Sequence, residues 1–139
     1  MAYLKSGRLA DVMTLIQILA FAPWALRSSD GLNEDLRRGP LSAETWAELA
    51  RLHPGFFRVL EVNEGQRHSI SLVARFVLPN APSLTGGDPK PPPLSPDVTN
   101  MLMNVAVQLH DREIQRRDRW NTVLVPTIVA IIARLAAGG

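Results

Sequence analysis

The amino-acid sequence predicts a mainly α-helical chain with one β-hairpin, in which a proline-rich linker separates an N-terminal domain from a long C-terminal helix. Apolar residues recur every three or four positions in "RLADVMTLIQILA", as in an amphipathic helix. β-Branched and aromatic residues fill "FFRVLEV" and "QRHSISLVARFV", as in paired strands. Seven prolines in "PNAPSLTGGDPKPPPLSP" indicate a linker. We therefore expect a domain over residues 1–78, a linker over 79–96 and a helical region over 97–139.

Three helices are predicted before the hairpin. The first carries the apolar pattern that begins at Leu9, and it breaks near Pro23. A short polar helix or turn follows in "LNEDLRRGP" and ends at its Gly-Pro pair. Ser42 is the expected N-cap of the third helix, and Pro54 disfavours helical geometry in the residue before it. This third helix is therefore about three turns long.

The two strand-like segments are joined by "NEG", which puts Gly65 where a tight hairpin loop favours a positive φ angle. Helix, short helix, helix and hairpin follow one another in the order of a winged helix-turn-helix domain. In such a domain the hairpin is the wing, and residues 42–53 lie in the place of the recognition helix. An unrelated α+β unit with the same order of elements is the alternative.

The helical region after the linker begins with Ser95 as N-cap and Pro96 at the first helical position. Apolar residues then recur at the spacing of a coiled-coil seam. The stripe consists of Val98, Met101, Leu102, Val105 and Leu109, of which Leu102, Val105 and Leu109 have the seam spacing. Arginines fall on the continuing seam after about two heptads, which is short for a stable coiled coil. Two interpretations stay open: self-association of residues 97–119, or packing of this stripe against the N-terminal domain.

The C-terminal segment "VLVPTIVAIIARLAAGG" predicts a membrane anchor. The expected anchor residues are Trp120, Val123, Leu124, Val125, Ile128, Val129, Ile131 and Ile132. Trp120 lies where an interfacial aromatic residue belongs, and a basic cluster precedes it, as the positive-inside rule expects. This juxtamembrane cluster consists of Arg112, Arg116, Arg117 and Arg119.

The length of this segment leaves a second interpretation open. A helix over residues 122–137 spans roughly 24 Å, whereas the hydrocarbon core of a bilayer is about 30 Å thick. A buried C-terminal helix in a soluble protein is the usual explanation of a short apolar run. However, a domain of about 70 residues has little core with which to cover a helix that is apolar on all sides.

Four stretches of the chain resemble a group of small, uncharacterised bacterial proteins that pair a winged-helix-like N-terminal domain with a C-terminal hydrophobic anchor. The stretches are "RLADVMTLIQILA", "WAELARLHPGFFRV", "SISLVARF" and "QLHDREIQRRDRW". The resemblance implies an architecture and no particular activity. Because the sequence shows no secretory signal peptide and a basic cluster precedes the apolar segment, we expect the bacterial inner membrane with the N-terminal domain in the cytoplasm; without an anchor, the protein would be cytoplasmic. The chain departs from the group in its short apolar segment, which also carries Arg134.

The sequence holds no pattern typical of catalysis. It has no cysteine, and its histidines, His53, His68 and His110, are far apart in the chain. HExxH, Walker, GxGxxG and GxSxG motifs are all absent from the sequence. We therefore predict no enzyme, no metal, no cofactor and no small-molecule substrate.

The predicted function is a non-enzymatic interaction or adaptor module that its C-terminal helix tethers to the cytoplasmic face of a membrane. Arg58, Arg67 and Arg75 on the hairpin are the candidate contacts to an acidic protein partner. A DNA-binding winged-helix regulator and a soluble oligomeric adaptor are the alternatives. Nucleic acid is disfavoured, because residues 8–78 carry eight arginines against eight acidic residues and the candidate recognition helix carries Glu44 and Glu48.

Overall fold

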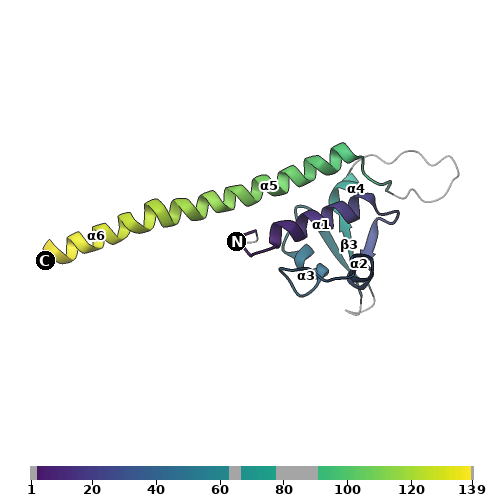
Figure 1. The fold of residues 1–139 in the computed structure, drawn as a ribbon, viewed down its shortest axis with the longest axis horizontal. Coiled ribbons are helices and arrows are strands. Elements are labelled where there is room, and N and C mark those ends of the chain that lie inside the picture. Colours follow the sequence, from purple (N-terminus) through teal and green to yellow (C-terminus); the bar gives the residue numbers. More distant parts are fainter. Residues whose placement is uncertain (1–2, 63–66, 78–90, 139) are drawn as a thin grey trace.

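The computed structural model describes residues 3–62, 67–77 and 91–138. In chain order its elements are α1 (Arg8–Phe21), β1 (Leu26–Ser28), α2 (Ser29–Leu36), α3 (Trp46–Arg51), β2 (Phe57–Val62), β3 (Arg67–Leu72), α4 (Val73–Val77), α5 (Pro96–Arg119), the π-helical segment η1 (Trp120–Leu124) and α6 (Val125–Gly138). Figure 1 shows that α1 to α4 form one unit, which we call the body. The remaining elements form a continuous long helix that runs along the body and then beyond it (Figure 1).

The sheet of the body has three antiparallel strands in the order β1-β3-β2. The predicted hairpin is present as β2 and β3, but the prediction of a hairpin alone is wrong, because β1 pairs with the other side of β3. Ser71 in β3 lies between Leu26 and Arg58 in the two neighbouring strands. With only three residues, β1 is too short to show the alternation by which a strand is recognised in a sequence. The expected loop glycine, Gly65, lies outside the described residues.

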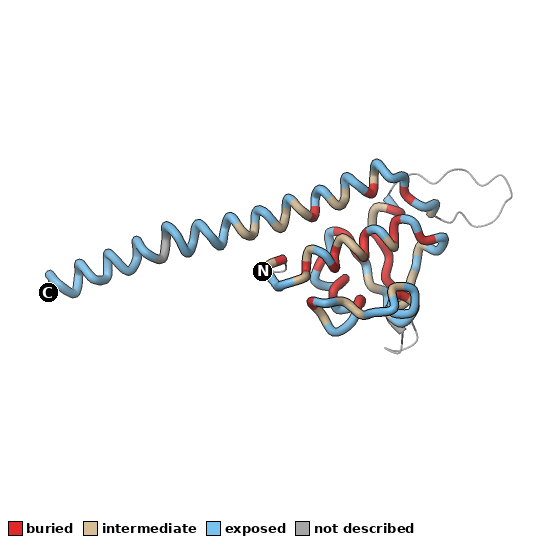
Figure 2. Tube along the Cα trace, viewed as in Figure 1, coloured by how far each residue is buried: buried red, intermediate tan, exposed pale blue. Residues whose placement is uncertain are grey.

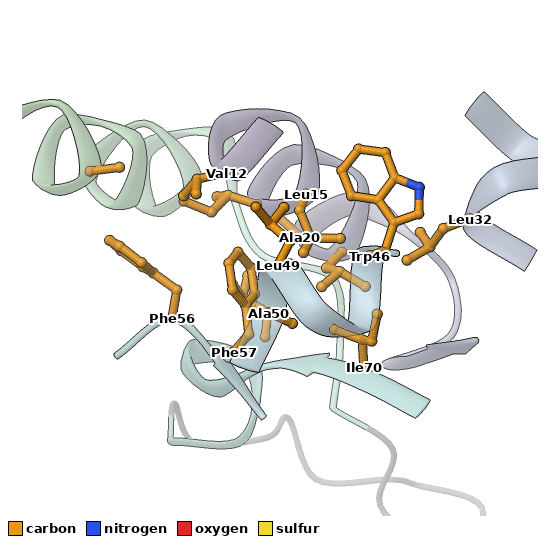
Figure 3. Packing of buried hydrophobic residues seen from close by; sticks show 14 of the residues in the cluster. Val12, Leu15, Ala20, Leu32, Trp46, Leu49, Ala50, Phe56, Phe57 and Ile70 are labelled. Atoms are coloured by element: carbon orange, nitrogen blue, oxygen red, sulfur yellow. The ribbon is translucent and has the colours of Figure 1, made fainter. Parts of the chain in front are cut away.

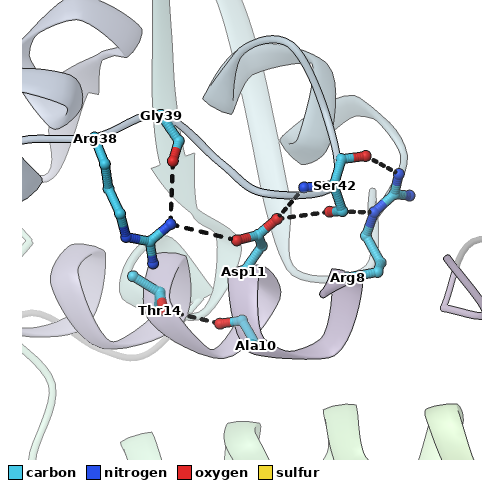
Figure 4. A network of polar contacts seen from close by, with 7 residues as sticks. All are labelled: Arg8, Ala10, Asp11, Thr14, Arg38, Gly39 and Ser42. Carbon is cyan, nitrogen blue, oxygen red and sulfur yellow. Dashed lines mark hydrogen bonds and ion pairs between the residues drawn. The ribbon is translucent and has the colours of Figure 1, made fainter. Parts of the chain in front are cut away.

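The third helix begins later than expected. Its N-cap is Thr45, whose side-chain oxygen accepts a hydrogen bond of 3.1 Å from the N–H of Glu48. The prediction that Ser42 is this cap is wrong, because Ser42 is buried and its hydroxyl donates to the carboxylate of Asp11 at 2.6 Å (Figure 4). The serine therefore fixes the loop before α3 to α1 instead of starting the helix.

The buried apolar residues lie where α1 and α3 cover one face of the sheet (Figure 3). Val12 and Leu15 of α1, Trp46 and Leu49 of α3 and Ile70 of β3 are almost fully inaccessible. The α1 residues follow the three-four spacing that predicted this helix, and the helix ends before Pro23 as expected. The residues that form the periodic apolar pattern in the sequence are thus the ones that α1 buries in the core.

The first half of the long helix completes the body. Thr99 and Ala106 of α5 are buried against it, and Leu102 is partly buried there. At the start of the helix the N–H of Leu94 donates to the carbonyl of Ala20 at 2.9 Å. Val98, Leu102 and Leu109 of the predicted stripe pack against the N-terminal domain, whereas Met101 and Val105 are exposed, so self-association through residues 97–119 stays a prediction. Figure 2 shows the burial fading along this helix, from mixed colours beside the body to uninterrupted exposure at the C-terminal end.

Candidate functional site

The most unusual surface of the molecule is the second half of the long helix, residues 120–138, which we call the tail. Every tail residue whose side chain is described is exposed. The helix over Pro96–Gly138 is the one helix in the described ranges that is long and apolar enough to cross a membrane. Its most apolar window of 18 residues has a mean hydropathy of 1.6, and no part of that window is buried. The body therefore does not use this apolar surface as core.

The apolar part of the long helix is longer than the segment of residues 122–137 that the sequence analysis compared with the thickness of a bilayer. The whole helix has 43 residues, so no loop separates the apolar part from α5. Its apolar window of 18 residues spans about 27 Å at a rise of about 1.5 Å per residue. A hydrocarbon core is about 30 Å thick, and small mismatches are absorbed at modest cost.

Pro126 is accommodated by the local geometry of the tail. Inside an α-helix a proline has no N–H to donate, and its ring clashes with the carbonyl four residues earlier. In this chain the π-helical segment of residues 120–124 directly precedes α6, and the wider turns relieve that conflict. The hydroxyl of Thr127 donates to the carbonyl of Val123 at 2.6 Å. Because its hydrogen bond is made within the helix, this hydroxyl needs no water as a partner. A polar group can lie in lipid only when it is satisfied in this way.

The predicted anchor residues share one environment. Trp120, Val123, Ile128, Val129, Ile131 and Ile132 are all exposed. The side chains of Leu124 and Val125 lie outside the described part of the chain. Trp120 follows directly on the last turns of α5, where the four arginines of the juxtamembrane cluster are exposed. Those arginines are Arg112, Arg116, Arg117 and Arg119.

The three arginines predicted as hairpin contacts have different places. Arg58 is exposed on β2. Arg67 pairs with Val62 at the loop end of the hairpin, and its side chain lies outside what the structure describes. Arg75 does not lie on a strand, because the chain turns into α4 after Leu72. The sequence predicted all three on the hairpin, but only Arg58 and Arg67 lie there.

Arg75 is buried, so the expectation that it meets a partner is wrong. One guanidinium nitrogen donates to the carbonyls of Leu19 at 2.9 Å and Ala22 at 2.7 Å, and the other donates to Pro91 at 2.8 Å. The last carbonyls of a helix lack hydrogen-bond partners within the helix and carry partial negative charge. At the end of α1, the guanidinium supplies both the hydrogen bonds and a positive charge. Burial lowers the pKa of this guanidinium. Arg75 thus joins the end of α1 to the segment that leads into α5.

The face of α3 carries little positive charge. Glu48 is exposed on this helix, and Glu44 is exposed in the loop directly before it. Arg51 lies at the end of α3, 3.5 Å from the carboxylate of Glu61 and 3.1 Å from Nδ1 of His68. The arginine of this helix is therefore already bound to the hairpin, and two carboxylates remain where a phosphate backbone would approach.

Tyr3, His53 and Glu113 form a polar cluster where the N-terminal segment meets α5. The N–H of Tyr3 donates to Oε2 of Glu113 at 2.9 Å, and the ring centroids of Tyr3 and His53 are 4.6 Å apart. Desolvation, and then the charge of Arg8, lower the pKa of His53 to about 4. Desolvation and the charge of Glu113 raise the pKa of Tyr3 to about 12. The cluster fastens α5 to the body, and no sequence motif indicated that Tyr3 and Glu113 would meet.

Within the described ranges no group of three or more histidine, cysteine or acidic residues lies close enough together to hold a metal ion. Comparisons of the chain with protein-family models, with curated proteins and with solved structures found no match.

Proposed function

We propose that this protein is an interaction module tethered to a membrane by its tail. One observation carries the proposal: an apolar helix that leaves the body is exposed along its whole second half. An uncovered apolar surface of this size is unfavourable in water, and it marks a membrane or protein contact. The hydrocarbon core of a bilayer covers such a helix on every side.

The charges around the tail support one orientation. The arginine cluster at the end of α5 lies between the body and the apolar window, and lysine and arginine are enriched on the cytoplasmic side of membrane helices. The body would then lie in the cytoplasm, at the inner membrane of a bacterium. Arg134, near the far end of α6, can extend its side chain toward the opposite headgroups.

The topology of the body supports a winged-helix assignment. The elements follow the order α1-β1-α2-α3-β2-β3, and the hairpin of β2 and β3 stands in the position of a wing. This fold does not fix a function. Because the exposed charges of α3 are acidic and Arg51 is bound to Glu61, the body fits a protein partner better than DNA.

Fractionation of the full chain beside a version that ends at Arg119 tests the tether. We expect only the full chain to stay in membranes after a carbonate wash and to be released by detergent. The truncated chain keeps every residue of the body and of α5, so it controls for aggregation of the body. If both chains are soluble, the membrane proposal fails. If the full chain is then a larger oligomer than the truncated one, the tail is instead a contact between copies in a soluble adaptor.

A further inference from the structure

The sheet of the body ends in a strand with an open side. In the order β1-β3-β2, one long side of β2 has no strand beside it among the described residues. β2 has six residues, a common length for a strand, whereas the opposite edge strand β1 has three. An open edge presents unpaired N–H and C=O groups, and extended peptides bind such edges as additional strands.

A groove of about 270 Å³ lies over the face of the sheet that Arg58 and Leu60 of this edge strand share with Ser71 of β3. It is lined by Arg58, Leu60, Ser71, Val73, Phe76 and Val77. Phe76 is 51% exposed and Val77 is 73% exposed, so α4 leaves apolar side chains uncovered at the groove. Apolar surface of this kind, next to a charged residue, is typical of a contact site.

The charge in the groove indicates what kind of segment fits it. Arg58 is the one charged residue in the lining, and within the described ranges it has no hydrogen bond or ion pair. The other charged residue of β2, Glu61, is already paired with Arg51. A free guanidinium beside an open backbone edge favours a carboxylate, which it can bind through two parallel hydrogen bonds.

We propose that the open edge of β2 binds an extended, acidic segment of a partner protein as a fourth strand. A carboxylate on that segment lies beside Arg58, and an apolar side chain two positions along lies beside Leu60 and reaches the groove. Both project to the same face, because side chains alternate along a strand and Arg58 and Leu60 are two positions apart. This inference deepens the proposed function, since it names the partner chemistry of the tethered body.

The edge is accessible in the arrangement that a membrane tether imposes. The long helix packs on α1 and leaves the body on the side of the N-terminus (Figure 1). No described part of this helix forms a strand pair with β2.

Binding can be measured on the full chain in detergent micelles by fluorescence anisotropy. The probe is a labelled, end-blocked hexapeptide with the sequence phenylalanine-threonine-aspartate-threonine-valine-threonine. Its matched control has lysine in place of the aspartate. We expect the aspartate peptide to bind at least about tenfold more tightly than the lysine peptide, because one charge pair changes sign. Amide hydrogen exchange should slow in β2 when the aspartate peptide binds.

Two variants separate the charge from the apolar contact. Arg58→Glu should weaken the aspartate peptide about tenfold or more and reverse the preference between the peptides, while Arg116→Glu, a change of another exposed arginine, should leave both affinities unchanged. Phe76→Ser should weaken both peptides alike. Equal binding of the two peptides, or full retention of binding by Arg58→Glu, would overturn the proposal.

The chain itself provides a further outcome. If the aspartate peptide binds only after residues 78–90 are replaced by a glycine-serine segment, the occupant is this chain's own linker and the partner proposal is wrong. All these measurements are made in detergent and do not depend on membrane insertion. Failure of the peptide to bind is thus distinguishable from failure of the tether.

Discussion

Both halves of the long helix carry apolar residues, but α5 gathers them on one stripe among charged residues, whereas α6 is apolar almost throughout, and only residues of the α5 stripe are covered by the body. In α5, Ala106 is fully buried and Leu102 is partly buried against the body. In α6, Ile128 and Ile132 are 45% and 61% exposed, with no described residue of the body near them. The difference comes from α1, which lies beside the first half only (Figure 1). Apolar composition thus indicates that a surface needs covering, and the fold decides whether the chain covers it itself.

This comparison assigns different tasks to the two halves. If it is right, changes in the body and in α5 alter the stability of the fold, and changes in the tail alter only where the protein is found. Stability is measured by urea unfolding of the full chain in detergent, and location by carbonate-resistant membrane retention.

The largest loss of stability is expected when Asp11 is replaced by alanine. The buried carboxylate accepts hydrogen bonds from the N–H of Ser42 at 2.7 Å and from its hydroxyl at 2.6 Å, and it lies 3.7 Å from Arg38 (Figure 4). Charge-assisted hydrogen bonds of this kind contribute about 1.5–3 kcal/mol each, so we expect Asp11→Ala to lower the free energy of unfolding by about 3 kcal/mol. Asp118→Ala, at an exposed position, is the control. A change below about 1 kcal/mol would contradict this role.

Acid should loosen the contact between α5 and the body. The pKa of His53 is lowered from 6.5 to about 4 in the folded chain, so the unfolded chain takes up the proton first. The stability that this residue contributes is therefore fully present above pH 6.5 and is lost as the pH falls from 6.5 toward 4, by at most about 3 kcal/mol. His53→Phe keeps a ring beside Tyr3 and cannot titrate. The free energy of unfolding of this variant should depend less on pH over that window, and an unchanged pH dependence would refute the assignment.

Two alanines on the same helix give the most direct comparison of its halves. Ala106 is fully buried under α1, and Ala133 is exposed in the tail. Ala106→Leu should overpack the contact and lower the free energy of unfolding by about 1–3 kcal/mol, whereas Ala133→Leu should change it by less than about 0.5 kcal/mol. Equal effects at the two positions would show that the tail is packed against something in solution.

The smallest effect is expected at Thr127. Its hydroxyl is bonded to the carbonyl of Val123 in the same helix, so it contributes no outward polar contact. Thr127→Val should leave membrane retention unchanged, because the hydroxyl that it removes is already satisfied within the helix. A large loss of retention in this variant would mean that the hydroxyl serves a partner helix.

The sequence predicted the elements whose signals are local. The periodic apolar face of α1 and the cap at Ser95 are each readable within one stretch of chain. The misplaced features depend on distant residues. Ser42 has the chemistry of a cap, but it is used by Asp11 from another element. Arg75 has the chemistry of a surface residue, but it is bound by carbonyls 53 and 56 positions earlier.

The sequence predicted which residues make up the tail, but it did not predict how the tail joins α5. The apolar run and its arginines are plain in the sequence, whereas the continuity of α5 with the tail depends on a π-helical segment that absorbs Pro126. The groove beside β2 was not predicted, because α4 occupies a stretch whose β-branched and aromatic residues predicted the end of a strand. Tertiary contacts of Arg75 explain that change.

The unbroken helix from the body to the tail has a mechanical consequence. Because α5 is fastened to the body and continues as one helix into the tail, no loop separates the body from the tail in this part of the structure. Tilting or rotating the helix in the bilayer would tilt or rotate the whole body with it. A ligand that reoriented the body would, by the same continuity, also turn the tail, so under the proposed tether the helix would pass orientation between the body and the membrane.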